Sequence, residues 1–352
     1  MLMKCIKTAA WLGVALLVGG CGHLLNDKRT HTYDTVYITD ADGTNVVQVS
    51  PDLDYHYGQA DWAPDGTQIA YASSDLGDIF VSAISGGDAV NLTNTTDQVE
   101  HTPKWSPDGT RVAYYVRAGS QNSVYVRLAD GSNPVLILEN VSQFAWSPDS
   151  AYLSVVSAEK LYLVEAASGD NDGVYAQNVS DDAAVTWLST TKLRYVGTDA
   201  TTYCLSLSPS ELLPLRDISE MSLTLPQPQM LPSWTDDGYY TVSTTGSVQK
   251  VLSHASYATL SADASHIVSV YQNTLYRHTA SGTASEVVFS ATDSQLGLPV
   301  LSGTHLLFNS GTRIYLGEIA SGLPTQIATG LDPKLSPDGS KITYVGFRRV
   351  SE

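Results

Sequence analysis

A short motif centred on tryptophan recurs along the whole chain. Clean copies read Trp-(Ala/Ser)-Pro-Asp-(Gly/Ser), one further copy reads Leu-Ser-Pro-Asp-Gly, and the remaining copies are degraded. The first residues of the copies, here called anchors, are Trp62, Trp105, Trp146, Trp187, Trp234, Leu260, Leu301 and Leu335. Successive anchors are 43, 41, 41, 47, 26, 41 and 34 residues apart. A period near 40 residues means that one structural unit is repeated around or along the molecule.

The chemistry of the motif favours a tight turn between two strands. Proline presets φ, the Asp side chain accepts hydrogen bonds from nearby backbone amides, and Gly or Ser tolerates the turn geometry. Strand-like segments follow each turn, such as residues 68–72, 78–81 and 89–92, and a further one ends at the next anchor. Four strands per repeat predict an all-β chain, a β-propeller of four-stranded antiparallel blades.

Eight anchors predict eight blades, with seven as the alternative. The 26-residue interval after Trp234 is short for four strands, so one blade is expected to be incomplete. The C-terminus offers an inner strand ending at Leu335 and a second strand at 341–345, whereas the N-terminus offers two strands at 35–39 and 46–50. We therefore expect the N-terminal strands to complete the last blade, which closes the ring and removes an open sheet edge.

Composition agrees with a strand-rich fold and excludes one class of partner. The chain has 20 Tyr, 27 Gly and 15 Pro, which favour strands and turns over helices. It carries 19 Lys and Arg against 36 Asp and Glu, a net charge of -17. Nucleic acid is excluded as a partner because a phosphate backbone requires a basic surface.

The N-terminus predicts export and lipidation. Lys4 and Lys7 precede an apolar run at 9–18, which is typical of a signal peptide and too short to span a membrane as a helix. The run ends Val-Gly-Gly-Cys21, which resembles the lipobox of bacterial lipoproteins. That resemblance implies that Cys21 becomes the acylated first residue, and Gly22 after it implies the outer membrane. The alternative is an ordinary secretory signal in which Cys21 is incidental.

These features divide the 352 residues into four parts. We expect a signal peptide at 1–20, a lipidated tether at 21–33, the propeller at 34–348 and a C-terminal tail at 349–352. Removing residues 1–20 removes two lysines and no acid, so the mature charge is 17 minus 36, or -19. Cys204, in a strand-like segment, is then the one cysteine left for the propeller, and we expect it in the core.

The repeat resembles that of TolB-type β-propellers, which centres on Trp-Ser-Pro-Asp-Gly. The similarity is strong at Trp62, Trp105, Trp146 and Leu335 and weak between about 187 and 330. TolB itself is excluded, since its separate N-terminal α/β domain has no room before the first strand. The resemblance implies a non-enzymatic scaffold that binds an envelope protein or peptide segment at the mouth of the central channel.

Three catalytic alternatives follow from related propellers. A prolyl-oligopeptidase-type hydrolase is excluded because the chain contains no Gly-x-Ser-x-Gly. A sialidase-type Asp box is excluded because no Trp ends the motif. A sugar-binding propeller or metal-assisted polysaccharide lyase stays open, because His56, His101 and His254 precede inner strands and could gather near the axis. The simpler interpretation of these histidines is a polar, solvated rim.

The candidate residues fall into three groups. Cys21 is the predicted lipidation site, and no catalytic residue, metal or cofactor is predicted. Two Asp-x-Asp-Gly segments, 40–43 and 170–173, are typical of hairpin turns and lack the further ligands of a calcium loop. The predicted channel-mouth binding residues are His56, Tyr57, Glu100, His101 and Asp181. The predicted structural anchors of the repeat are Trp62, Asp65, Trp105, Asp108, Trp146, Asp149, Trp187, Trp234, Leu335 and Asp338.

Overall fold

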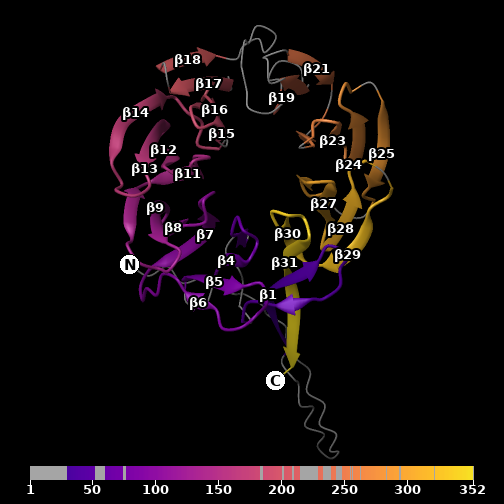
Figure 1. The fold of residues 1–352 in the computed structure, drawn as a ribbon, viewed down its shortest axis with the longest axis horizontal. Coiled ribbons are helices and arrows are strands. Elements are labelled where there is room, and N and C mark those ends of the chain that lie inside the picture. Colours follow the sequence, from indigo (N-terminus) through magenta and orange to yellow (C-terminus); the bar gives the residue numbers. More distant parts are fainter. Residues whose placement is uncertain are drawn as a thin grey trace, which may run out of the picture.

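The strands form eight antiparallel sheets arranged as a ring around a central axis (Figure 1). The structure, a computed structural model, describes residues 30–51, 60–73, 77–182, 185–199, 202–207, 210–214, 229–232, 239–242, 248–253, 255, 257–261, 263–282, 284–292, 295–320 and 322–351. Within these ranges the chain forms strands and turns, and no helix is present that could cross a membrane. The prediction of an all-β ring is therefore confirmed.

Each sheet is one blade, and the blades follow one another along the chain. Blade 1 is β3(Asp61–Trp62), β4(Gln68–Ala72), β5(Ile79–Ala83) and β6(Val90–Asn91). Blade 2 is β7(Val99–Trp105), β8(Arg111–Ala118), β9(Gln121–Leu128) and β10(Val135–Leu138). Blade 3 is β11(Val141–Trp146), β12(Tyr152–Ser157), β13(Lys160–Glu165) and β14(Asn171–Gln177), and blade 4 is β15(Thr186–Ser189), β16(Lys192–Val196), β17(Thr202–Leu207) and β18(Ser210–Pro214). Blade 5 is β19(Gln229–Pro232), β20(Tyr239–Val242) and β21(Val248–Leu252). Blade 6 is β22(Tyr257–Leu260), β23(His266–Tyr271), β24(Thr274–Thr279) and β25(Ser285–Ser290). Blade 7 is β26(Val300–Ser302), β27(His305–Ser310), β28(Arg313–Glu318) and β29(Thr325–Thr329).

Blade 8 is built from both ends of the chain, as predicted. Its order is β2(Val47–Gln48), β1(Thr30–Asp40), β31(Lys341–Ser351) and β30(Leu331–Leu335). The central pair is longer than expected, because β1 begins at Thr30 rather than near 35 and β31 runs to Ser351 rather than ending at 345. Eleven residue pairs join the two strands, from Thr30↔Ser351 to Asp40↔Lys341.

The short anchor interval corresponds to the one blade with fewer strands. Blade 5 has three strands in the part of the chain that the structure describes, whereas the other seven blades have four. The anchor Trp234 lies outside the described residues. The prediction of one incomplete blade is met by this three-stranded sheet.

The hydrophobic core is divided among the spaces between neighbouring blades. Ile38 of blade 8 packs with Trp62 and Ile69 of blade 1, and Val81 of blade 1 packs with Trp105 of blade 2. Each sheet is therefore covered on both faces, and strands such as β4 and β12 are buried at nearly every residue rather than at alternate ones.

The motif turns are held by one repeated set of hydrogen bonds. In the clean copy at Leu335, Ser336 donates its hydroxyl to Asp338 Oδ1 at 2.6 Å, and the Ser340 amide donates to the same oxygen at 3.0 Å. The Lys341 amide donates to Ser336 Oγ at 2.9 Å, which fixes the start of the next strand. The corresponding aspartates Asp65, Asp108, Asp149 and Asp263 accept hydrogen bonds within their own turns in the same way.

The anchor tryptophans join neighbouring blades. Trp62 Nε1 donates to the carbonyl of Lys334 at 3.2 Å, and Trp146 Nε1 donates to the carbonyl of Lys104 at 3.1 Å. In both cases the acceptor is the residue just before the anchor of the preceding blade. Trp187 Nε1 follows the same rule with Ala145, at 3.4 Å. Trp62, Trp146 and Trp187 thus form hydrogen bonds between blades in addition to their packing in the core.

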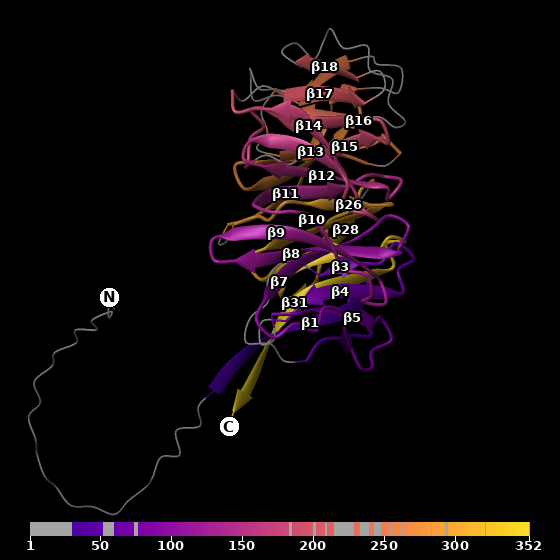
Figure 2. The same cartoon turned by 90° about the vertical axis from the view of Figure 1, so that its left-hand side faces the viewer.

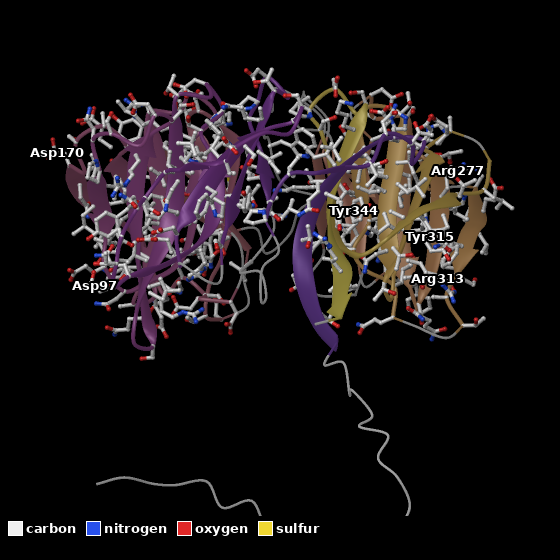
Figure 3. All side chains as sticks on the ribbon, turned by 90° about the horizontal axis from the view of Figure 1, so that it is seen from below. Asp97, Asp170, Arg277, Arg313, Tyr315 and Tyr344 are labelled. Atoms are coloured by element: carbon white, nitrogen blue, oxygen red, sulfur yellow. The ribbon has the colours of Figure 1, made fainter. Side chains whose placement is uncertain are left out.

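The ring has two faces with different loops. Each inner strand begins on one face, here called the entry face, and ends at a motif turn on the other, here called the turn face. In Figure 3, Asp97 and Arg313 lie towards the side where β1 and β31 leave the ring. Asp170 and Arg277 lie towards the opposite side. The paired strands β1 and β31 therefore extend from the entry face, and Figure 2 shows them leaving the ring together.

Candidate functional site

The predicted binding residues separate into three environments. His56 and Tyr57 lie outside the described residues, as does His254. Glu100 and His101 lie in the inner strand β7, and Asp181 lies in the link from blade 3 to blade 4. The described candidates therefore lie at the entry-face ends of their blades.

Glu100 is not at the rim, contrary to the expectation. Its side chain is 0% exposed because the link before β7 folds over it. Thr95 donates its hydroxyl to Glu100 Oε1 at 2.8 Å, and Thr93 donates to Oε2 at 3.1 Å. A residue enclosed in this way cannot contact a partner directly.

Asp78 lies beside Glu100 and makes a buried carboxyl pair with it. Asp78 Oδ1 accepts hydrogen bonds from the Thr95 amide at 2.9 Å and the Thr93 hydroxyl at 3.2 Å. Asn91 donates to its Oδ2 at 2.7 Å. Burial raises the pKa of Glu100 to about 7, and the nearby charge of Asp78 adds to the rise. The sequence offered no signal for this pair, since its members are 22 positions apart in the chain and lie in different blades.

His101 is held by its neighbours rather than free in solvent. Its side chain is 9% exposed and its ring stacks on Tyr115, with 5.2 Å between centroids. Nδ1 lies 3.0 Å from Thr102 Oγ1, and Nε2 lies 3.2 Å from Asn122 Oδ1. Burial lowers the pKa of His101, so the neutral imidazole is favoured.

A chain of contacts runs from His101 across the boundary between blades 2 and 3 to Asp181 in the link that follows blade 3. The Tyr115 hydroxyl donates to the carbonyl of Ser142 in β11 at 3.2 Å, and Phe144 packs edge-on against the Tyr115 ring. Ser142 in turn donates its hydroxyl to Asp181 Oδ1 at 2.7 Å. Ser142 and Asp181 are both exposed, so this chain is open to solvent at its blade 3 end.

Gln143 fixes the link that carries Asp181. Its Nε2 donates to the carbonyl of Ser180 at 3.1 Å, and its Oε1 accepts the amide of Val185 at 3.0 Å. One amide side chain thus makes hydrogen bonds to two points of this link, at Ser180 and at Val185. The position of Asp181 is set by blade 3 and not by the link alone.

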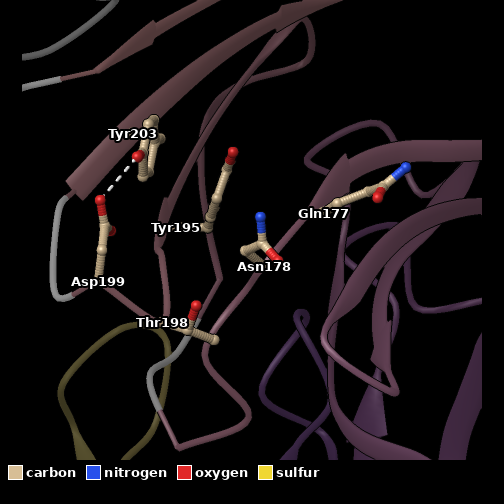
Figure 4. Close-up of a pocket in the computed structure, with 6 residues that line it drawn as sticks. All are labelled: Gln177, Asn178, Tyr195, Thr198, Asp199 and Tyr203. Atoms are coloured by element: carbon tan, nitrogen blue, oxygen red, sulfur yellow. Dashed lines mark hydrogen bonds between the residues drawn. The ribbon is translucent and has the colours of Figure 1, made fainter.

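A polar pocket of about 260 Å³ lies next to this link (Figure 4). It lies between the end of blade 3 and the β16–β17 loop of blade 4. Tyr203 donates its hydroxyl to Asp199 Oδ2 at 3.1 Å and stacks on Tyr195, with 5.2 Å between ring centroids. The lining residues are Gln177, Asn178, Tyr195, Thr198, Asp199 and Tyr203. Sequence reasoning missed this pocket because its residues come from two repeats, and the motif of the second repeat, at Trp187, is degraded.

The residues just before the anchors form a second charged group, nearer the axis. Asp61 Oδ1 lies 2.5 Å from Lys334 Nζ and 3.7 Å from Lys104 Nζ. Its Oδ2 accepts the Trp105 backbone amide at 2.8 Å. Asp61 therefore ties blade 8 to blades 1 and 2. Sequence reasoning did not single out the two lysines.

Further sequence expectations concern the remaining chemistry. Among the described residues, no group of three or more His, Cys, Asp or Glu side chains could hold a metal ion. Residues 40–43 form a turn in which Asp42 accepts the Thr44 amide at 2.9 Å, in agreement with a hairpin. Cys204 is buried in β17, and burial raises its thiol pKa, so the expectation of a core cysteine is met.

Comparison with known proteins adds support for the architecture. No family model and no curated protein matches the chain. The Dos1 propeller is 10% identical, with a TM-score of 0.56, over 82% of this chain and 92% of that one. The dihydro-heme d1 dehydrogenase NirN is 11% identical, with a TM-score of 0.57, over 84% and 74% of the two chains. The fold is a β-propeller.

A candidate TolB from Agrobacterium tumefaciens is also similar. It is 15% identical, with a TM-score of 0.44, over 91% of this chain and 99% of that one. At these identities the similarity of the solved structures concerns the fold alone.

Proposed function

We propose that this protein is a lipid-anchored, non-enzymatic scaffold of the bacterial cell envelope. In this proposal Cys21 carries the lipid, the protein resides at the outer membrane, and the propeller captures a protein or peptide segment on its entry face. The lipobox-like Val-Gly-Gly-Cys21 segment and the TolB-like repeat support the proposal. The proposed binding role rests on a strip of polar and aromatic side chains on the entry face.

This entry-face strip is defined by Tyr115, Ser142, Asp181, Asn178 and Asp199. It crosses blades 2, 3 and 4 without a break in contacts from Tyr115 to Asp181 and continues into the adjoining pocket. Its exposed members supply carboxylate, amide and hydroxyl groups on a frame fixed by β-strands. Such a frame binds with little loss of conformational freedom.

The charges of the strip indicate the chemistry of its partner. Asp181, Asp182 and Asp199 are all exposed, and the whole chain carries a net charge of -17. A segment with Lys or Arg side chains and free backbone N–H groups would complement these acceptors. A basic peptide segment of an envelope protein is therefore the proposed ligand.

Photo-crosslinking tests this proposal. A photoreactive phenylalanine analogue at Asn178 on the entry face, and the same analogue at Tyr152 on the turn face, would be compared in cells. We expect an adduct from position 178 and none from position 152. The purified partner must then bind the purified protein, more weakly to D181N and D199N and unchanged to D130N on the turn face. Equal binding to all variants would refute the role of the strip.

A second function, sugar binding, is favoured by the pocket alone. Its lining combines two amides, a carboxylate, hydroxyls and tyrosine rings, groups that hydrogen-bond and stack against a saccharide. Titration with neutral and acidic oligosaccharides, followed by NMR, tests this alternative. Binding that N178A abolishes would support it, whereas no shift at Asn178 would exclude a sugar in this pocket.

A further inference from the structure

The paired strands β1 and β31 extend beyond the ring as a two-stranded ribbon. In the four-stranded part of blade 8, β2 pairs with β1 at Tyr37 and Ile38, and β30 pairs with β31 from Ile342 to Val345. Beyond this part, five pairs from Asp34↔Phe347 to Thr30↔Ser351 are formed by β1 and β31 with each other. At about 3.4 Å per residue the ribbon is about 17 Å long.

Strand direction fixes the face from which the ribbon leaves. β31 starts after the motif turn 336–340 and so runs from the turn face to the entry face. It continues past the ring in that direction, and antiparallel β1 brings the chain in along the same path. The first and last described residues, Thr30 and Ser351, therefore lie on the entry-face side, where β1 and β31 leave the ring in Figures 2 and 3.

The composition of the ribbon differs from that of the ring. Phe347 is 44% exposed and Arg348 is exposed. Residues 30–34 and 347–351 together contain two arginines and one acid, a charge of +1 in a chain of net charge -17. Lys28 and Arg29 precede the ribbon directly in the sequence. An exposed aromatic ring next to cationic groups is the combination that favours an interface with anionic lipids.

The distance to the lipidation site is short. Eight residues lie between Cys21 and Thr30, so the ribbon begins no more than about 30 Å from the acylated residue even if the tether is fully extended. An acyl chain at Cys21 would keep the tip of the ribbon within reach of head groups at all times. The ribbon contact would then act together with the lipid and orient the propeller on the membrane.

We propose that the ribbon stands on the anionic phospholipid surface and turns the entry face of the propeller towards the membrane. This inference rests on the proposed lipidation of Cys21. The length of the ribbon holds the entry face about 17 Å from the lipid surface. β7, with seven residues, sets the depth of the ring at about 23 Å, which places the turn face about 40 Å away.

Energy transfer to labelled lipids tests this orientation. The acylated full chain would be reconstituted into phosphatidylethanolamine vesicles with phosphatidylglycerol and an acceptor dye on a trace of head groups. Donor dyes would be attached at E139C on the entry face or Y152C on the turn face, both exposed positions on either side of β11. We expect strong transfer from position 139 and a large loss of transfer from position 152. Equal or reversed transfer would overturn the orientation.

A dye at the ribbon tests the contact itself. An environment-sensitive dye at F347C should brighten and shift to shorter wavelength on anionic vesicles, and this response should fall on purely zwitterionic vesicles and with R348E. No response on anionic vesicles would overturn the role of the ribbon. The intact mass of the purified protein reports acylation independently. An unacylated Cys21 would refute the proposed function, whereas an acylated protein with the opposite orientation would refute this inference alone.

Discussion

Replacing Glu100 by glutamine tests the buried carboxyl pair. Glu100 is 0% exposed and its pKa rises from 4.5 to about 7, a change of about 2.5 pH units. At about 1.4 kcal/mol per unit, the ionised form of Glu100 costs the folded state at most about 3 kcal/mol. In E100Q the amide oxygen can still accept from Thr95, and the amide N–H groups can donate to Asp78.

The sign of the effect follows from proton binding. Between pH 4.5 and 7 the folded protein holds a proton on Glu100 that the unfolded chain has released. The free energy of unfolding therefore falls as pH rises through this window and is level above it. E100Q carries no such proton, so it should match the wild type near pH 4.5 and exceed it by about 1–3 kcal/mol at pH 8.

Urea denaturation at pH 5 and pH 8 would measure this difference. Glu139→Gln is the matched control, since Glu139 is an exposed carboxylate in the link that follows blade 2. The control should show no gain at pH 8. If E100Q is less stable than the wild type at pH 8, or if its advantage is the same at both pH values, the burial argument is wrong.

Three further predictions concern the anchors, a motif turn and the core cysteine. W146F removes the indole N–H that donates to the Lys104 carbonyl, whereas the indole N–H of Trp105 has no hydrogen-bond partner among the described residues. In a denaturation experiment, W146F should therefore lower the free energy of unfolding by about 1 kcal/mol more than W105F does. S336A removes the first of the hydrogen bonds that hold the Asp338 pKa at about 2, so an NMR titration should find that pKa raised towards 3.8; an unchanged value would contradict the assignment. Cys204, buried and with a raised thiol pKa, should not react with a thiol reagent in the native protein and should react on unfolding, whereas rapid native labelling would show that β17 is open.

Much of the fold could be predicted because similar side chains pack between neighbouring blades at each boundary of the ring. Each Trp anchor that the structure describes packs towards the preceding blade, so the spacing of the anchors in the sequence reports the spacing of blades. The closing pair could be predicted because the chain ends supply complementary halves of one blade. The length of β1 and β31 could not, since nothing in residues 30–34 or 347–351 resembles an alternating strand with a buried face.

The candidate site was harder to predict, because contacts across blade boundaries decide which side chains are exposed. Glu100 and His101 are adjacent, yet one is enclosed with Asp78 and the other stacks on Tyr115. A register shift between His101 and Lys104 changes which face each following residue meets. Lys104, Lys334 and Asp61 carry a usable signal in retrospect, because each directly precedes an anchor.

Closure by β1 and β31 also determines the order in which the molecule can be completed. Thr30 is among the first described residues to leave the ribosome and Ser351 among the last, so their pairing joins nearly the most distant parts of the sequence. Contacts of such separation carry a high entropic cost and slow folding. Until β31 arrives, β1 and β2 remain a hairpin with an open edge. A chain made N-terminus first would therefore stay an open arc until β31 is available to pair with β1.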